Sequence, residues 1–327
     1  MRNIVAAIVI GLSCVVTVSS CSSADLSERT PAKEVPLEGV DAILAERESL
    51  RSLDPCGYFD DAAIHRIGTP DAIEIDNSFD TCMVTFRPPH DLASISVSIG
   101  GLTEADLGQG PLLHTPQHQI GDTTVRTFSV DRLSCNAIVP VNDYWSIAIG
   151  ALAAAGREGR PRDQCAAALE LATAIVPRRL DRPLRVNSPH THRNSRLAAL
   201  DPCKVLDTLG QGHHPYRVND TSPWNCSFEL DNNDDGILQH IDLHFAEPGE
   251  VADATVTGTT IGGLRAREYY LSAEASPLKR SRCRIAIWTP VDERIGHSES
   301  ITISTDECAA GRAVGEEIVR LFNQLPR

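Results

Sequence analysis

Two cysteine-containing segments recur in the same order in the two halves of the chain. Leu53-Asp54-Pro55-Cys56 recurs as Leu200-Asp201-Pro202-Cys203, and Asp163-Gln164-Cys165-Ala166-Ala167 recurs as Asp306-Glu307-Cys308-Ala309-Ala310. Each half has two more cysteines between these segments, and corresponding cysteines are 143 to 148 positions apart. Ordered landmarks at a nearly fixed spacing indicate an internal repeat. We therefore interpret the chain as one domain duplicated in tandem rather than as two unrelated disulfide domains.

The pattern within each repeat predicts an α+β domain, an antiparallel sheet with helices at its N- and C-terminal ends. Asp54 and Asp201 are good helix N-caps, and each precedes a proline, which fits the first position of a helix. Apolar residues then alternate with polar ones, as in a strand with one buried face. The alternating residues are Ile95, Val97 and Ile99 in the first repeat, and Ile237, Ile241, Leu243 and Phe245 in the second.

Corresponding segments of the two repeats predict the remaining elements. Strands are expected at 83–86 and 227–230, at Gly121–Val130 and Gly262–Leu271 as paired strands, and at 145–149 and 300–304. Closing helices are expected over Asp163–Val176 and Asp306–Leu325, where apolar residues recur at helical spacing.

The first twenty residues have the features of a secretory signal peptide. Arg2 precedes an uncharged apolar run, Ile4–Val18, which is too short to span a bilayer. Val18-Ser19-Ser20-Cys21 resembles the lipobox of bacterial lipoproteins, which implies cleavage before Cys21 and a diacylglycerol on its sulfur. The alternative is an ordinary secreted protein cleaved at a nearby small residue. We expect a lipid-anchored chain on the extracytoplasmic side of the cell membrane, with residues 21–39 as a flexible tether.

Eight of the ten cysteines remain after Cys14, in the signal peptide, and Cys21 are set aside. An even number in an exported chain indicates structural disulfides. Four cysteines per repeat permit three pairings, and the sequence alone does not choose among them. We predict the pairs that join a helix start to a strand within one repeat: Cys56–Cys82, Cys135–Cys165, Cys203–Cys226 and Cys283–Cys308.

The Leu-Asp-Pro-Cys start, a second cysteine before a strand, a third in a strand and the Asp-x-Cys-Ala-Ala helix together resemble a known family. These features look like the actinobacterial lipoproteins of unknown function whose domain begins with this motif. They are more distantly similar to the extracellular sensor domains of mycobacterial serine/threonine kinases. The resemblance implies a PsbP-like α+β fold with two disulfides per domain. It carries over no functional residue, and the tandem arrangement departs from the family's single domain.

The domain boundaries follow from the repeat: residues 40–180 form the first copy, residues 181–196 the linker and residues 197–327 the second copy. The stretch Arg178–Arg196 contains six arginines and few apolar residues, which predicts a solvated linker in an otherwise acidic protein. Such a linker cannot hold two cores together, and only a direct interface between the repeats could fix their orientation, so we expect each repeat to fold alone.

The net charge of -14 argues against nucleic acid as a partner, because binding phosphate backbones needs a concentrated positive surface. It also argues against electrostatic docking onto anionic lipid headgroups. We therefore expect that the two acyl chains at Cys21 provide the membrane attachment.

Two groups of residues have the chemistry of metal ligands. Asp231–Gly236 fits the start of a calcium loop, but a strand over 237–245 would carry Asp242, the closing carboxylate, about 20 Å from the glycine. An acidic hairpin turn explains the segment better. His240, Asp242 and His244 share one face of that strand, where a solvated polar face is the commoner interpretation and zinc would need a further ligand.

The other candidates are weaker. His190, His192, His213 and His214 lie in linker or loop segments, and Ser276-Pro277-Leu278-Lys279 lacks the partner motifs of penicillin-binding enzymes. No phosphate loop, dinucleotide motif or nucleophile elbow occurs. We therefore expect no cofactor, no metal and no catalysis. The leading hypothesis is a binding module for an envelope protein, lipid or glycan; the alternatives are a structural or assembly factor, or a hydrolase with unrecognised chemistry.

Overall fold

The computed structural model describes residues 46, 48–75, 78–100, 114–129, 131–154, 161–188, 190, 195–213, 215–218, 222–230, 239–244, 254–272, 282–290 and 298–326. The chain divides into Met1–Val40, which lies outside the described residues, and a compact unit, Asp41–Arg327, which contains both repeats. The described part is α+β and has two antiparallel sheets.

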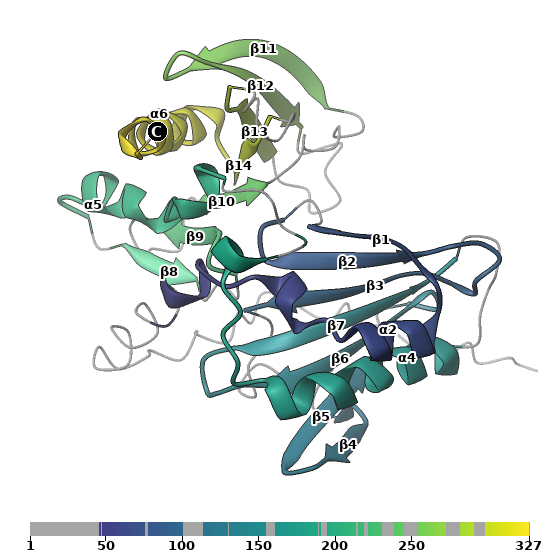
Figure 1. Ribbon diagram of the computed structural model, residues 1–327. Coiled ribbons are helices and arrows are strands. Elements are labelled where there is room, and N and C mark those ends of the chain that lie inside the picture. The colour runs from purple at the N-terminus through teal and green to yellow at the C-terminus, as the bar shows by residue number, and fades with distance from the viewer. Residues whose placement is uncertain are drawn as a thin grey trace, which may run out of the picture. The chain divides into compact units, whose positions relative to one another are not determined.

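The first repeat contains a sheet in the order β1-β2-β3-β7-β6-β5-β4 (Figure 1). The strands are β1 (Pro70–Ile75), β2 (Thr81–Phe86), β3 (Leu92–Ile99), β4 (Gln117–Ile120), β5 (Thr123–Phe128), β6 (Ser134–Pro140) and β7 (Ser146–Ala153). Ile95, Val97 and Ile99 of β3 are buried, as their alternation predicts. The helix α4 (Pro161–Ile175) packs on β6 and β7.

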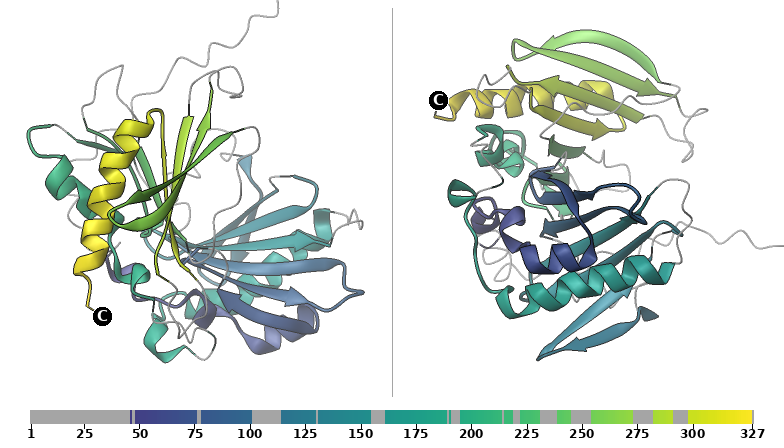
Figure 2. Two further views of the ribbon diagram at one scale, coloured as in Figure 1. Left: turned by 90° about the horizontal axis from the view of Figure 1, so that it is seen from above. Right: turned by 45° about the vertical axis from the view of Figure 1, so that its right-hand side comes forward.

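The second repeat has the same topology, with the order β8-β9-β10-β14-β13-β12-β11 when read in the same direction. The strands are β8 (Tyr216–Val218), β9 (Asn225–Glu229), β10 (Gln239–His244), β11 (Thr255–Ile261), β12 (Leu264–Leu271), β13 (Arg282–Trp288) and β14 (Ser300–Thr305). The helix α6 (Cys308–Gln324) lies along one face of this sheet (Figure 2). The equal strand order agrees with the duplication inferred from the sequence.

Both repeats begin with the expected cap and a short 3₁₀ helix, η1 (Pro55–Tyr58) or η6 (Pro202–Val205). The Asp54 and Asp201 carboxylates accept hydrogen bonds from the backbone N–H of the cysteine two residues later. Short α-helices follow, α2 (Asp61–Ile67) and α5 (Leu206–Leu209). Further 3₁₀ turns are η3 (Val176–Arg178), η4 (Arg185–Asn187) and η5 (Leu197–Ala199).

Four disulfides hold these elements together. They are Cys56–Cys82, Cys135–Cys165, Cys203–Cys226 and Cys283–Cys308, the same pairs that the sequence analysis predicts. In each repeat one bond joins the initial 3₁₀ helix to the second strand. The other joins the closing helix to the sheet, which fixes the face that this helix covers.

The paired strands predicted at Gly121–Val130 and Gly262–Leu271 require a correction. Each segment begins in a hairpin turn, and its partner strand lies before the glycine, as β4 and β11. Gly121 and Gly262 have φ values of 58° and 56°, a left-handed conformation that glycine adopts at little cost. The strands themselves start at Thr123 and Leu264.

The described part of residues 181–196 is partly solvated, with Asp181, Arg182, Leu184, Val186 and Asn187 exposed, but it also contacts both repeats. The Pro183 carbonyl accepts a hydrogen bond from the Asp54 backbone N–H, and Leu184 forms a bridge with Leu53. At the other end, the Arg196 guanidinium donates to the carbonyls of Phe322 and Leu325 at the end of α6. This segment is therefore packed against both repeats.

The repeats also contact each other directly. The rings of Phe79 and Trp224 have centroids 5.9 Å apart, and the guanidinium carbon of Arg185 lies 4.7 Å from the Trp224 centroid. The buried side chain of Arg51 donates to the Pro223 carbonyl at 3.2 Å and lies 3.5 Å from the Asp201 carboxylate. This interface argues against the expectation that each repeat folds alone.

Candidate functional site

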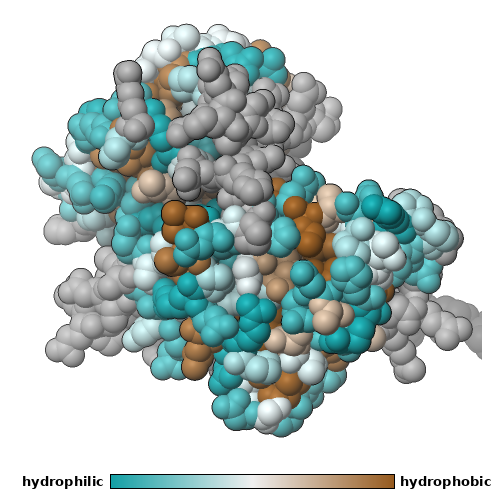
Figure 3. All heavy atoms as spheres, in the orientation of Figure 1, coloured by the Kyte–Doolittle hydropathy of each residue, from teal (hydrophilic) through white to brown (hydrophobic). Residues whose placement is uncertain are grey.

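Several sequence predictions fall outside the described residues. These are the signal peptide, Cys21, the tether at 21–39, the acidic segment Asp231–Gly236, His192, His214 and Ser276–Lys279. Within the described residues, no helix has the length and apolar character needed to cross a membrane. The surface view in Figure 3 shows a face on which hydrophilic residues predominate and hydrophobic residues form small separate groups.

The second sheet has one face that α6 does not cover, which we call the outer face. Gly311 and Gly315 of α6 approach Ile285 and Ile287 of β13, so these residues point toward the helix. Side chains alternate along a strand, so Arg284, Ala286 and Trp288 point to the outer face. The strand register then aligns three rows of outer-face residues across β12, β13, β14 and β10: Trp288, Ser300 and His244; Arg267, Ala286, Thr302 and Asp242; and Tyr269, Arg284, Ser304 and His240.

Two arginines of β12 lie against the indole of Trp288. The guanidinium carbons of Arg265 and Arg267 are 4.6 Å and 5.6 Å from the centroid of the Trp288 ring. Both arginines are exposed, whereas Trp288 is 5% exposed and packs with Tyr269 and Ala286. The negative face of an indole attracts a cation, so the buried ring holds both guanidiniums over this part of the sheet.

Two buried hydrogen-bonding groups on the outer face have no partner among the residues that the structure describes. They are the indole Nε1 of Trp288 and the hydroxyl of Thr302, which is 3% exposed. An unsatisfied buried polar group carries a free-energy cost of about 1–3 kcal/mol. Such groups are therefore candidates for contact with a ligand.

His240, Asp242 and His244 lie on the outer face, on the side of β10 predicted from the alternation. His240 Nδ1 lies 2.6 Å from the Ser227 hydroxyl, and His244 Nε2 lies 2.9 Å from the Asp242 carboxylate. Among the described residues, no three His, Cys, Asp or Glu side chains, these included, are placed so that they could hold a metal ion. The Ser227–His240 pair resembles part of a catalytic triad in composition alone, because the Asp242 carboxylate contacts the other histidine, His244.

The outer face of the first repeat has a different chemistry at the equivalent positions. Arg126, Ile138, Ala148 and Ser98 form the row that corresponds to Arg267, Ala286, Thr302 and Asp242. Pro140 corresponds to Trp288, and Ser96 to His240. Only the arginine of β5 and β12 is common to the two rows. The aromatic ring, the hydroxyl at the Thr302 position and the histidines belong to the second repeat.

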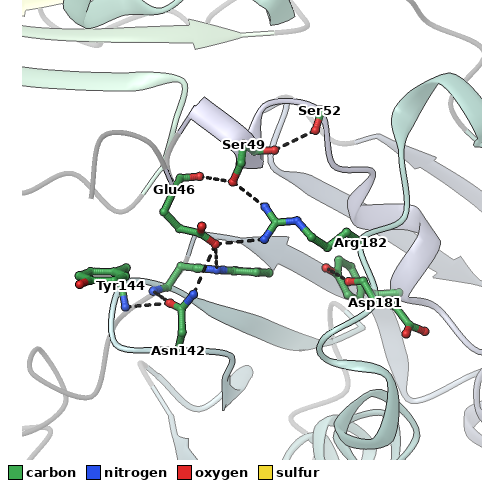
Figure 4. A network of polar contacts seen from close by, with 9 residues as sticks. Glu46, Ser49, Ser52, Asn142, Tyr144, Asp181 and Arg182 are labelled. Carbon is green, nitrogen blue, oxygen red and sulfur yellow. Dashed lines mark hydrogen bonds and ion pairs between the residues drawn. The ribbon is translucent and has the colours of Figure 1, made fainter. Parts of the chain in front are cut away.

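A polar network in the first repeat has a structural role (Figure 4). The Glu46 carboxylate accepts hydrogen bonds from Trp145 Nε1 at 2.8 Å, Arg182 at 3.1 Å and Asn142 at 3.4 Å. The network ties the N-terminal segment to the β6–β7 turn and to the segment between the repeats. The neighbouring Tyr58 hydroxyl donates to the Asp181 carbonyl, and burial raises the pKa of this phenol.

A depression of about 430 Å³ lies beside α6, and its lining includes Leu209, Gly262, Val319 and Arg320. The Arg320 guanidinium already makes two hydrogen bonds, at 2.6 and 2.7 Å, with the Glu317 carboxylate. Of its three charged lining residues, Arg320 and Glu317 therefore pair with each other, and Glu316 is the third.

Sequence reasoning missed Arg265, Arg267, Trp288 and Thr302. The alternation of Arg265 and Arg267, and of Arg282 and Arg284, is a usable signal, but only the strand register shows that the residues share a face. No protein-family model, curated protein or solved structure matches this chain, so the geometry alone carries the functional argument.

Proposed function

We propose that this chain is an extracytoplasmic lipoprotein that binds an envelope ligand, without catalysis, through the outer face of its second repeat. The observation that carries the proposal is the contrast between the two outer faces. The outer face of the first repeat presents mostly small and neutral side chains. The second copy presents Arg265 and Arg267 over Trp288, and Thr302 lies in the same cross-strand row as Arg267, two strands away.

Protein stability does not account for this contrast. A buried indole N–H and a buried hydroxyl without partners lower the stability of the fold, and the first repeat forms the same sheet without them. Residues that cost stability on an otherwise shared scaffold are typical of binding sites. The four disulfides support an oxidising, extracytoplasmic environment.

The binding proposal is tested on the full chain purified from its own membranes. Native mass spectrometry is expected to detect a co-purifying ligand on the unaltered protein. The ligand is expected to be lost from the Arg265→Ala/Arg267→Ala variant and retained by Arg126→Ala, the matched change in the first repeat. Equal ligand occupancy in all three proteins would rule out the outer face as the binding site.

The lipid anchor has a separate test. We expect Cys21→Ser to release the protein from the membrane fraction, because the substituted residue lacks the sulfur that carries the diacylglycerol. Fractionation followed by immunoblotting measures the release. Retention of the variant in the membrane fraction would contradict anchoring through Cys21.

A further inference from the structure

The segment between the repeats concentrates exposed apolar side chains. Eight large apolar residues are exposed among the residues that the structure describes, and three of them, Leu180, Leu184 and Val186, fall within seven positions. Leu180 is 68% and Val186 is 72% exposed, more than any of the other six. Single exposed apolar residues need no explanation, whereas several together are typical of a surface that contacts another molecule.

A fourth exposed apolar residue, Tyr144, lies in a turn that is joined to this segment. The Asn142 side chain accepts a hydrogen bond from the Tyr144 backbone N–H at 2.9 Å and donates to the Glu46 carboxylate at 3.4 Å. The Arg182 guanidinium, from the middle of the exposed segment, donates to the same carboxylate at 3.1 Å (Figure 4). We call these four residues the exposed apolar group: Tyr144, Leu180, Leu184 and Val186.

The charges around this group are balanced. Residues 178–186 contain four arginines and one acidic residue. Three of the arginines form ion pairs with carboxylates: Arg178 with Asp181, Arg179 with Asp122, and Arg182 with Glu46. This segment therefore lacks the excess of negative charge that gives the whole chain its net charge of -14. An anionic bilayer repels an acidic protein least where the negative charges of that protein are offset.

The chain approaches this surface from the expected lipid anchor. Glu46, to which Arg182 and Asn142 donate, is the first described residue and follows Cys21 by 25 positions. A stretch of that length spans at most about 90 Å, so a diacylglycerol on Cys21 keeps the protein close to the bilayer. A further contact with the bilayer is then intramolecular, and a weakly binding surface suffices to orient the protein.

We propose that the exposed apolar group docks the folded repeats on the lipid bilayer. The inference rests on the lipid anchor of the proposed function and adds the surface that meets the membrane. Leu180, Leu184 and Val186 would enter the interfacial region. Tyr144 suits the same depth, because a tyrosine ring is apolar and its hydroxyl is polar. The neighbouring arginines can keep their charged ends among the headgroups while their stems lie along apolar surface.

Hydroxyl-radical footprinting with mass spectrometry tests the docking on the full-length lipidated chain. The protein in vesicles of phosphatidylcholine and phosphatidylglycerol is compared with the Cys21→Ser variant in solution without lipid. On the vesicles, oxidation of the exposed apolar group is expected to fall by roughly threefold or more, because inserted side chains are shielded from water. The internal controls are the other exposed apolar residues, which should keep their oxidation rates: Leu133, Leu152, Val256 and Tyr270. Equal protection of both sets, or protection of neither, would overturn the proposal.

A triple variant, Leu180→Ser/Leu184→Ser/Val186→Ser, is expected to abolish the protection of Tyr144 while the chain remains anchored. The matched control, Leu133→Ser/Leu152→Ser/Val256→Ser, removes the same number of exposed apolar side chains and should leave Tyr144 protected. Circular dichroism verifies that both variants are folded. Undiminished protection of Tyr144 in the first variant would count against the docking surface.

A further arm removes the dependence on the anchor. Sedimentation of the Cys21→Ser chain with the same vesicles, at high lipid concentration, measures docking alone. Binding that the triple serine change in residues 180–186 weakens by roughly tenfold or more would support the proposal, even if Cys21 carries no lipid. Protection in native membranes but not on pure lipid vesicles would overturn it in favour of a protein partner. Release of Cys21→Ser and ligand binding at the outer face are measured separately, so failure of the proposed function is distinguished from failure of the docking.

Discussion

The Arg185 guanidinium is a charge held at the contact between the repeats. It donates to the Phe79 carbonyl and lies over Trp224, while Asp54 and Asp80 stabilise its charge. Burial nevertheless lowers the pKa of Arg185 to about 10. Desolvation therefore outweighs the attraction of the two carboxylates.

Replacing Arg185 with Met is expected to destabilise the protein by about 1–3 kcal/mol, because the buried Asp54 carboxylate then loses a neighbouring cation. The free energy of unfolding in urea measures the effect. Arg87→Met is the control: Arg87 pairs with Asp71 on the surface, and its loss should cost no more than about 1 kcal/mol. Equal stability of the two variants would show that the Arg185 contacts contribute nothing.

The lowered pKa of Glu317 predicts that the stability of the fold depends on pH. The hydrogen bond from Arg320 is the main cause that lowers the pKa of Glu317 below 4.5. The folded state therefore binds this proton less readily, so the stabilisation is present above pH 4.5 and is lost as the pH falls through the folded pKa. We expect unfolding curves of Glu317→Gln and the unaltered chain to converge in acid. Glu316→Gln, a change at the exposed neighbour, should show no such convergence.

At the scale of elements, Gly262 is the point at which the β11–β12 turn packs against Val319 of α6. A Cβ at this position would overlap the side chain of Val319, whereas one at Gly121, the equivalent turn, would meet nothing. Both glycines have positive φ, so alanine costs about 1–2 kcal/mol of strain at either position. Overpacking should add about 1–3 kcal/mol to the cost of Gly262→Ala. Adding Val319→Ala should relieve only this second part, and denaturant unfolding measures each step.

The elements that could be predicted are those in which buried apolar residues recur at a regular spacing in the sequence. Strand β3 alternates Ile95, Val97 and Ile99, and the closing helices begin beside a repeated cysteine. Strand β11 was missed because six of its seven residues are not buried, so no apolar period marks it. The outer face was missed for another reason. Its residues come from separate strands, and cross-strand register is a long-range property that sequence periodicity does not contain.

At the scale of the whole molecule, the interface makes the two repeats depend on each other. Arg51 of the first repeat is 7% exposed, and its described partners include Pro223 and Asp201 of the second. Trp224 is 1% exposed and contacts Phe79 and Arg185. Separating the repeats would expose the rings of Phe79 and Trp224 to water, which costs free energy because apolar surface is hydrated. It would also remove the carbonyl and carboxylate partners of the Arg51 guanidinium.

We therefore expect residues 41–327 to unfold in one calorimetric transition, and residues 197–327 alone to melt at a lower temperature or without cooperativity. Phe79→Ala tests the coupling within the intact chain, because the substitution lies in the first repeat but removes a contact of Trp224. It should lower the stability reported by probes in both repeats equally. Phe128→Ala, at the end of strand β5 and apart from the interface residues named above, provides the comparison. Two separate transitions, with only the first shifted by Phe79→Ala, would show that the repeats fold independently and that the contact between them is incidental.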